Sequence, residues 1–364
     1  MLTRRQGEIL EIIRGEPLVA QQELADRLGI SRSAVAGYIM QLTDLGLIRG
    51  RGYLLSEPDY VCVVGGANVD VEGRVPGPLV PHDSNPGTVK RSPGGVGRNI
   101  AENLARLNVS TRLITALGRD NYGTWLHDQT ASAGVDLADC AWSESVPTAT
   151  YLSVIDGSGE MTVAVNDMAV LSVLDTDALD ARRDTVARAA AVVVDCNLAP
   201  DSLGHVVNTL ARGPVFVDPV STAKAQRISP HLASVHTLKP NRVEAALLAG
   251  VEITGKRSLH SAASALLDEG VQQVIISLGA DGVFFADAET SGTLVAPART
   301  VASVTGAGDA LMAGLVHAHL AELPIDEAAR FALAAAALTA RSTTPVAQDL
   351  SADNIADILK KEAS

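Results

Sequence analysis

The residues with the clearest chemical potential lie in a glycine-rich turn, Val-Thr-Gly-Ala-Gly-Asp, at positions 304–309. A β-branched run ends there, and a helical pattern of small apolar residues begins at Asp309. Because glycine permits tight turns, the residues before Asp309 can point several backbone N–H groups at one spot, at the positive end of a helix. Such a spot suits a phosphate, and Asp309 could take a proton from a hydroxyl group beside it. A plain strand-to-helix turn, with Asp309 as a helix cap, explains the segment equally well.

Two more polar side chains follow the first apolar strand pattern, residues 60–64. Asn68 and Asp70 come soon after it, and ligands of open α/β sheets bind beyond the carboxyl ends of strands. A carboxylate there can accept two hydrogen bonds from a vicinal diol, which makes Asp70 a candidate sugar ligand. The alternative is an aspartate that caps its own turn.

A second glycine-rich stretch, with Gly94 and Gly95, precedes a helical pattern that carries Asn99. Paired glycines before a helix expose backbone N–H groups, and Asn99 projects into the same space. The stretch lacks the third glycine of a dinucleotide motif, and we expect no strand directly before it. Alone, it therefore identifies no ligand.

Candidates for the nucleotide side are Asn241 and Glu244, which follow a strand and share one helix face at i, i+3. An amide and a carboxylate so placed could hold hydrated Mg²⁺ near phosphates, and an N-cap with a solvated Glu244 is the alternative. Residues 277–282 follow another strand, where a nucleotide could approach the backbone or the chain could simply turn. Residues 250–257 imitate a P-loop, but Arg257 replaces the magnesium-binding hydroxyl, so we interpret them as a surface connection between helices.

Composition sets the class of protein. The 364 residues are 47% hydrophobic, enough for a large core and two domains, and the net charge of −13 argues against a nucleic-acid coat. The three cysteines lack metal or redox spacing, which fits a reducing compartment. With no membrane-spanning run and no signal-peptide core, the sequence predicts a cytoplasmic protein.

The order of elements predicts an α/β fold. From about residue 178 onward, strand and helix patterns alternate, as in a parallel sheet with crossover helices. Residues 151–155 and 160–165 form a hairpin pattern, and residues 73–91 appear as loop or short edge strand. Together these segments could form a small sheet over Asp70, with Asn166 at its end reaching a bound ligand.

The first 56 residues form a unit of their own. Three helical patterns, with Ser31 as N-cap of the third, precede a short ribbon that carries Arg49 and Arg51. This arrangement resembles the winged helix-turn-helix domains of bacterial regulators. Arg32 and Ser33 would begin the helix that enters a DNA groove, with the wing arginines on phosphates. Because residues 1–56 have a net charge of only +1, a docking or dimerisation module without DNA binding stays an alternative.

Residues 60 to about 350 resemble the ribokinase-like (PfkB) family of carbohydrate and nucleoside kinases. Four motifs occur in family order: Gly-Gly-Ala-Asn-Val-Asp, Pro-Gly-Gly-Val-Gly-Arg-Asn, Lys-Pro-Asn-Arg-Val-Glu and Val-Thr-Gly-Ala-Gly-Asp-Ala. The resemblance implies a Rossmann-like sandwich in residues 57–364, with a β lid from about 71–92 and 147–167, and residues 1–56 as the winged domain. It implies that the reaction uses ATP as co-substrate and Mg²⁺ as cofactor. Further expectations are a monovalent cation such as K⁺ and a homodimer through the lid. The resemblance also implies the residues of the site. In that site Asp309 would be the catalytic base, and the anion hole would be formed by Gly306, Ala307 and Gly308. The substrate would be bound by Asn68, Asp70, Gly94, Gly95, Asn99 and Asn166. The nucleotide would be bound by Asn241, Ser277, Gly279, Gly282 and Thr305, and Glu244 would bind the metal through water.

Within this family, several stretches are similar to bacterial pseudouridine kinases, among them residues 83–87, 159–161, 166–168 and 195–197. The expected reaction is phosphoryl transfer from MgATP to the 5′-hydroxyl of pseudouridine. Stand-alone pseudouridine kinases lack the N-terminal winged helix. Two alternatives therefore stay open: a kinase for ribose, inosine or uridine, and a transcription regulator that uses the kinase domain as a ligand sensor.

Overall fold

The computed structural model describes residues 2–48, 60–296 and 306–362, in two compact units, Met1–Asp59 and Tyr60–Ser364. The predicted wing arginines, Arg49 and Arg51, and the predicted nucleotide ligand Thr305 lie outside the described residues. Each unit has a hydrophobic core of its own.

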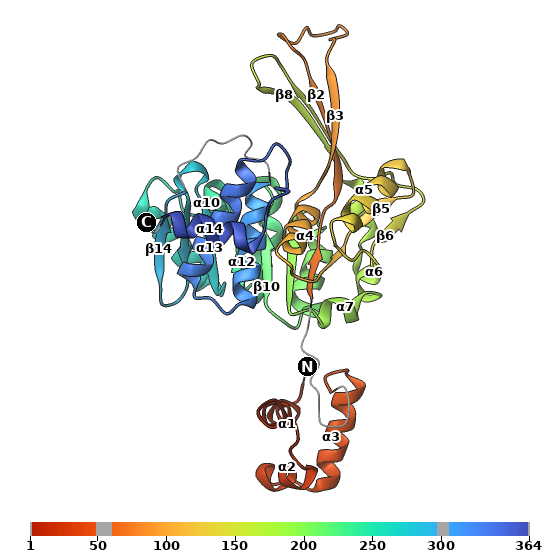
Figure 1. Ribbon diagram of the computed structural model, residues 1–364, viewed down its shortest axis with the longest axis vertical. Helices are drawn as coiled ribbons and strands as arrows, with labels where there is room; N and C mark the ends of the chain where they lie inside the picture. The colour runs from red at the N-terminus through yellow and green to blue at the C-terminus, as the bar shows by residue number, and fades with distance from the viewer. Residues whose placement is uncertain (1, 49–59, 297–305, 363–364) are drawn as a thin grey trace. The chain divides into compact units, whose positions relative to one another are not determined.

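In its described residues, 2–48, the first unit contains the helices α1 (Arg4–Gly15), α2 (Gln21–Leu28) and α3 (Arg32–Asp44) (Figure 1). The hydroxyl of Ser31 accepts a hydrogen bond from the Ala34 amide at 3.2 Å, so the predicted N-cap of the third helix is confirmed. Val35 and Leu42 are fully buried, in a core that also contains Ile9, Ile13 and Leu24. Arg32 and Ser33 are exposed at the start of α3.

The second unit is built on an eight-stranded sheet in the order β14-β13-β12-β11-β10-β9-β1-β4. Six neighbouring strands of this sheet run parallel, namely β4, β1, β9, β10, β11 and β12. At the other edge, β13 pairs antiparallel with β12, and β14 pairs antiparallel with β13. The strand bounds are β1 (Val61–Val64), β4 (Thr111–Ile114), β9 (Ala191–Asp195), β10 (Val215–Asp218), β11 (Thr237–Leu238), β12 (Gln273–Ser277), β13 (Val283–Ala286) and β14 (Ser291–Leu294).

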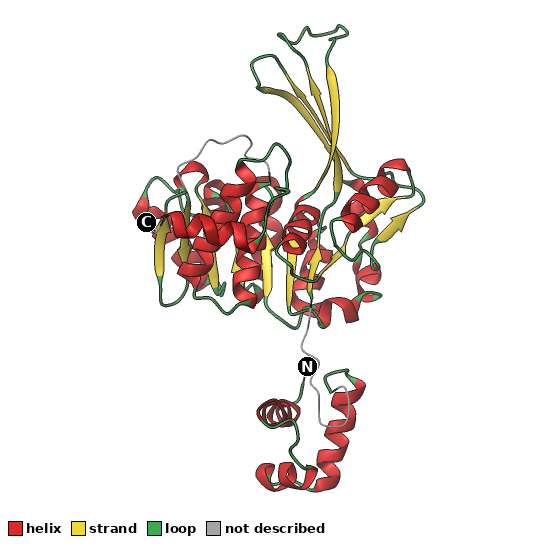
Figure 2. Cartoon of the chain, in the orientation of Figure 1, coloured by secondary structure: helices red, strands yellow, loops and turns green. Residues whose placement is uncertain are grey.

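Helices cover both faces of this sheet (Figure 2), which explains why its central strands β1, β9 and β10 are buried at every position. Along β1, Val61 and Val63 join the core on one face, whereas Cys62 and Val64 join the core on the other. The helices are α4 (Val96–Arg106), α5 (Asn121–Ser132), α6 (Thr176–Asp180), α7 (Arg183–Ala187), α8 (Pro200–His205), α9 (Thr222–Ala225), α10 (Arg242–Ala249), α11 (Lys256–Asp268), α12 (Ala307–Leu320), α13 (Ile325–Ala340) and α14 (Ala352–Glu362). None of the helices in the described ranges is long and apolar enough to cross a membrane.

A smaller four-stranded sheet, the lid, projects from the main body of this unit (Figure 1). Its order is β3-β2-β7-β8, from β2 (Asn68–Arg74), β3 (Thr88–Gly94), β7 (Thr150–Ile155) and β8 (Met161–Asp167). The predicted hairpin of β7 and β8 is confirmed.

Residues 73–91 were predicted as loop or short edge strand, and this is confirmed, because residues 75–87 lie between the strands and β3 lies at the edge of the lid sheet beside β2. One local prediction was wrong, because a strand, β3, does come directly before the helix that carries Asn99. After β4 the chain leaves the main sheet, and β5 (Ala116–Gly118) pairs with β6 (Ala141–Ser143). Residues 250–257 do connect two helices, α10 and α11, as predicted.

Candidate active site

Asp309 lies in the first turn of α12 and is 8% exposed. The helix begins after Gly306, whose φ of 82° lies in the left-handed region, and a Cβ there would collide with the carbonyl oxygen of Pro345. The N-cap residue is Gly306, and no side chain caps this end of the helix. The carboxylate of Asp309 accepts a hydrogen bond of 2.8 Å from Nδ2 of Asn99. The alternative in which Asp309 caps its own helix is therefore wrong.

Burial raises the pKa of Asp309 from 3.8 to about 8. Asp218 adds to the rise by charge repulsion, while the hydrogen bond from Asn99 and the charge of Lys239 oppose it. A carboxylate with a pKa near neutrality is a stronger proton acceptor than an ordinary aspartate. Asp309 therefore has the electrostatic setting of a general base.

Lys239 lies beneath the start of α12. Its Nζ is 2.9 Å from the carboxylate of Asp218, both side chains are buried, and Nζ packs against the Cα side of Gly308. The neighbouring carboxylates raise the pKa of Lys239 against the opposing effect of burial, which keeps it charged. A fixed positive charge thus lies beside the glycine turn.

Asp70 lies on β2, where its carboxylate accepts a hydrogen bond of 2.6 Å from Nδ2 of Asn68. The carboxylate also lies directly over Gly94, because a Cβ on Gly94 would collide with it. Burial raises the pKa of Asp70 to about 6. Residues 94–99 therefore contact both carboxylates, the predicted sugar ligand Asp70 through Gly94 and the predicted base Asp309 through Asn99.

The register of the lid places four polar residues in one row. Asp70 is directly opposite Ser92 on one side and Tyr151 on the other, and Tyr151 is opposite Asn166. Residues directly opposite each other point to the same face of a sheet. Ser92, Asp70, Tyr151 and Asn166 therefore share the lid face on which Asp70 lies.

Asp195 holds the glycine loops in place. Its buried carboxylate accepts hydrogen bonds of 2.8 Å from the backbone amides of Gly66 and Gly97, and one of 2.9 Å from Asn197. It thereby joins the end of β1, the end of β9 and the first turn of α4. Asp195 also lies directly opposite Asp218 in the sheet register.

The predicted nucleotide ligands lie at a neighbouring strand end. Asn241 caps α10, and its Oδ1 accepts from the amides of Val243 and Glu244, while the Glu244 carboxylate accepts from the amide of Asn241. Glu244 is 4% exposed, which excludes the solvated glutamate considered above. Ser277 forms a bridge with Asn241, so the turn that contains Gly279 and Gly282 lies beside this cap.

These groups fit a magnesium ion only through water. Backbone amides already occupy the Asn241 oxygen, and the described residues contain no group of three acidic, histidine or cysteine side chains that could hold a metal. Mg²⁺ commonly arrives with the nucleotide phosphates and keeps several waters. The buried carboxylate of Glu244 could bind such an ion through one of its waters.

Sequence reasoning missed four residues of this site. Lys239, Asp195 and Asp218 stand at strand ends, where polar side chains in an α/β sheet commonly meet a ligand, and that position was the available signal. Tyr151 gave no signal, because its place in the row depends on the pairing of β7 with β2.

Comparison with known proteins agrees with this architecture. Residues 58–350 match the pfkB family of carbohydrate kinases, and residues 2–49 match a winged helix-turn-helix DNA-binding family. An uncharacterized sugar kinase, YeiI, of Escherichia coli is 40% identical over 97% of this chain and 98% of its own. The pseudouridine kinase of the same organism is 38% identical over 84% of this chain and 98% of its own. The crystal structure of a putative sugar kinase from Clostridium perfringens superposes with a TM-score of 0.75 at 36% identity, over 84% of this chain and 96% of that one.

The chain belongs to the pfkB family of carbohydrate kinases and carries an N-terminal winged helix-turn-helix domain. It has the ribokinase-like α/β fold, as the sequence predicted. It is a phosphotransferase with an alcohol as acceptor, of the nucleoside and sugar kinase class.

Proposed function

We propose that this kinase transfers the γ-phosphoryl group of ATP to the 5′-hydroxyl of pseudouridine. The observation that carries the proposal is the hydrogen bond between Asn99 and Asp309 at the N-terminus of α12. It joins a buried carboxylate of raised pKa to the glycine-rich segment that also supports Asp70. Similarity to a pseudouridine kinase over 84% of the chain supports the choice of substrate.

In this mechanism Asp309 orients the 5′-hydroxyl and accepts its proton as the hydroxyl oxygen attacks the γ-phosphorus of ATP, and the bond from that phosphorus to the β–γ bridging oxygen breaks to release ADP. The backbone amides of Gly306, Ala307 and Gly308, at the positive end of α12, stabilise the negative charge on the phosphoryl group in transit. Lys239 adds positive charge beneath them. Catalysis of this kind consists mainly of positioning and electrostatic stabilisation.

The ribosyl group binds between the lid and the main sheet. Asp70 accepts hydrogen bonds from a sugar diol, Asn68 holds that carboxylate in place, and Gly94 and Gly95 let the sugar approach the backbone closely. The nucleobase meets the row on the lid, where Tyr151 offers an aromatic face and Asn166 an amide that can read the base edge.

The nucleotide takes the neighbouring strand ends, at Asn241 and Ser277 and the turn through Gly279 and Gly282. Glu244 would hold Mg²⁺ through one of its waters, and the ion would supply positive charge against the nucleotide phosphates. Lid closure over the site would exclude water and limit idle ATP hydrolysis.

A substrate panel tests the proposal. ADP release is measured with pseudouridine, uridine, inosine and ribose at equal concentrations, and kcat/KM is compared. Pseudouridine should give the highest value. A clear preference for another member would replace the substrate, and no turnover with any of them would favour the sensor alternative.

DNA binding by the first unit is a second proposal, favoured by the match to a winged helix-turn-helix family. Among its described arginines, Arg4 and Arg5 pair with Glu8, and Arg27 pairs with Glu16 and Glu23. Arg32, by contrast, is exposed at the start of α3, where it could contact a phosphate.

We also propose that the protein is cytoplasmic. The three buried free cysteines agree with a reducing compartment.

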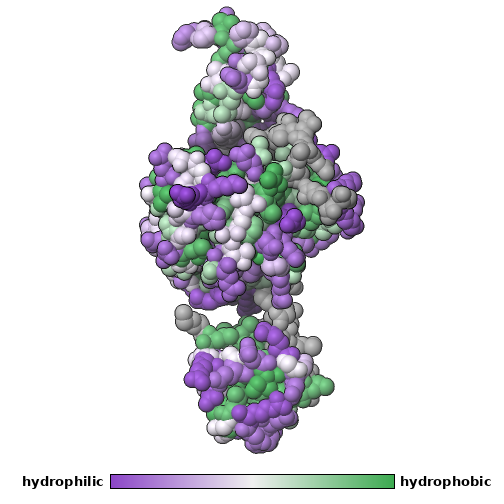
Figure 3. Space-filling view, turned by 90° about the vertical axis from the view of Figure 1, so that its left-hand side faces the viewer, coloured by the Kyte–Doolittle hydropathy of each residue, from purple (hydrophilic) through white to green (hydrophobic). Residues whose placement is uncertain are grey.

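A homodimer through the lid is a third proposal. Val89, Leu152, Val163 and Val165 lie on the lid face opposite Asp70, and they are 77%, 42%, 50% and 57% exposed. Hydrophobic atoms are visible on the lid surface in Figure 3. A second copy of the lid would bury this face. Sedimentation of the wild type and of Val163→Glu tests it: the wild type should be a dimer and the variant a monomer, and a monomeric wild type would end the proposal.

A further inference from the structure

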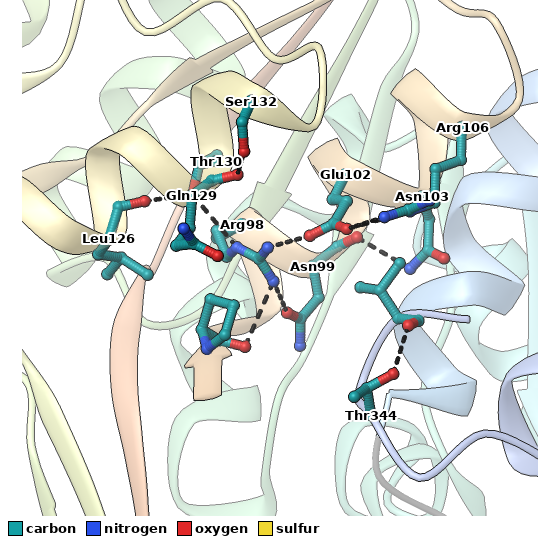
Figure 4. Close-up of polar contacts among 12 residues, drawn as sticks. Arg98, Asn99, Glu102, Asn103, Arg106, Leu126, Gln129, Thr130, Ser132 and Thr344 are labelled. Carbon is teal, nitrogen blue, oxygen red and sulfur yellow. Dashed lines mark hydrogen bonds and ion pairs between the residues drawn. The ribbon is translucent and has the colours of Figure 1, made fainter. Parts of the chain in front are cut away.

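Arg98 is the most completely enclosed cation next to the active site in the described residues. It lies on α4 directly before Asn99 and is 2% exposed. Its guanidinium forms an ion pair with Glu102 one turn later on the helix (Figure 4). It also donates to Oγ1 of Thr130 on α5 and to the carbonyl oxygen of Pro93 in β3, each at 3.3 Å.

A further bond of Arg98 reaches the active site. Nη1 donates to Oδ1 of Asn99 at 2.9 Å, and Nδ2 of the same amide donates to Asp309 at 2.8 Å. A side-chain amide has one accepting end and one donating end, whereas a guanidinium can only donate. With Arg98 on one side, the accepting end must face Arg98, and the donating end is left for Asp309.

We infer that Arg98 is a positioning residue of the phosphoryl transfer, which fixes the amide of Asn99 so that its N–H group always faces Asp309. The inference rests on the proposed role of Asp309 as base. Without Arg98, the amide can rotate and present its oxygen to Asp309. An oxygen in that place favours the protonated carboxyl group, which can donate to it, and disfavours the carboxylate that accepts the substrate proton.

Other charges around Asp309 do not replace this control. Asp218 and Asp195, from β10 and β9, repel the carboxylate, and Lys239, which follows β11, attracts it. None of the three donates a hydrogen bond to Asp309 in the structure, whereas Asn99 does. The bond of Arg98 to Pro93 also ties Asn99 to the root of lid strand β3, so that the same guanidinium holds the base and the lid.

A double-mutant cycle of Arg98→Met and Asn99→Ala tests the inference in the full-length protein. Arg106→Met is the matched control, because Arg106 also pairs with Glu102 from α4 but contacts Gln348 rather than Asn99. In Arg98→Met, Glu102 keeps Arg106 as partner, which limits the loss of stability. If Arg98→Met does not fold, Arg98→Gln, whose amide can accept as well as donate, takes its place in the cycle.

The first readout is kcat with the best substrate of the panel. Arg98→Met should lower it by about 10- to 100-fold, as expected for a lost charge-assisted hydrogen bond. In the Asn99→Ala background it should lower kcat no further, and Arg106→Met should leave it unchanged. Equal losses with and without Asn99 would overturn the inference.

The second readout needs no substrate. Carboxyl ¹³C resonances of labelled aspartate, with Asp309 assigned by Asp309→Asn, give the pKa of Asp309 in the free protein. Arg98→Met should raise it when Asn99 is present and not when Asn99 is alanine. A rise in both backgrounds would mean a through-space charge effect and would contradict the inference. Because this titration does not involve pseudouridine, failure of the substrate proposal leaves it interpretable.

Discussion

The carboxylate of Asp309 and the side-chain amide of Asn99 meet at 2.8 Å, although 210 positions of the chain separate them. This bond joins two glycine-rich turns, one before α4 and one before α12. The first turn supports Asp70, and the second holds the backbone amides that we propose stabilise the phosphoryl group. The kinase site therefore depends on how these two helices begin.

Replacing Asp309 by asparagine should lower kcat by about 10²–10⁴, the range for loss of a general base. Binding of the nucleoside, measured by calorimetry, should change little, because in the proposed mechanism Asp70 and the lid hold the sugar. Asp326→Asn is the control, since Asp326 occupies the first turn of the neighbouring helix α13. Near-normal turnover of Asp309→Asn would remove Asp309 from the role of base.

The pH dependence of kcat/KM should show a rising limb with an apparent pKa of about 8. Burial raises the pKa of Asp309 to that value, and only the ionised carboxylate can accept the proton of the substrate. Initial rates between pH 5 and 9.5 at low substrate concentration measure the limb. A limb near pH 4, the range of an ordinary aspartate, would contradict the environment described here.

The stability of the second unit should fall with pH in the same window. Folding raises the pKa of Asp309 from 3.8 to about 8. The contribution of Asp309 to the free energy of unfolding is therefore fully present below pH 3.8 and is lost as the pH rises through 8. Asp309→Asn lacks this ionisation. The melting temperature of Asp309→Asn minus that of the wild type should therefore be larger at pH 9 than at pH 5, by roughly 2 °C or more. A difference in melting temperature that is independent of pH would show that ionisation of Asp309 does not destabilise the folded protein.

Tyr151 should matter for nucleosides and not for free ribose. Base–aromatic stacking contributes about 1–3 kcal/mol, so Tyr151→Ala should raise KM for pseudouridine roughly 5- to 100-fold. Tyr151→Phe keeps the ring and should keep most of the affinity. KM for ribose, which has no base, should be unaffected in both variants. An equal loss for both substrates would mean that Tyr151 supports the lid rather than the base.

Arg32→Ala should weaken DNA binding and reduce the slope of log K against log salt by about 1, as for the loss of one phosphate contact. Arg27→Ala is the matched control, because Arg27 is held by Glu16 and Glu23 in two ion pairs. Fluorescence anisotropy with genomic fragments at several salt concentrations measures both. No binding by the wild type at low salt would end the DNA proposal.

The sequence predicts the local elements of the site better than their neighbours in space. Asp309, Asp70 and Asn99 stand in glycine-rich contexts with a chemical reason of their own, and the structure brings the first and third into contact. The partners of Asp309 could not be predicted, because they depend on the order of strands. Asp218 and Asp195 meet only because β9 and β10 are neighbours in parallel register.

Strand pairing also explains the one error in the lid, where no strand was expected directly before the helix that carries Asn99. Residues 88–91 have no strong strand pattern, and they form β3 because β2 offers an unpaired edge beside the site. The same pairing decides the face of every lid residue, since a shift by one position would move Tyr151 away from Asp70. Local propensity carries no information about that register.

The most direct test of the central claim is the product of the reaction. The protein is incubated with MgATP and pseudouridine, and ³¹P NMR and mass spectrometry locate the transferred phosphate. The account predicts a monophosphate ester on the 5′-oxygen with the wild type, formed at least about 10²-fold more slowly by Asp309→Asn. A phosphate on another oxygen, or the same product at the same rate from Asp309→Asn, would contradict it.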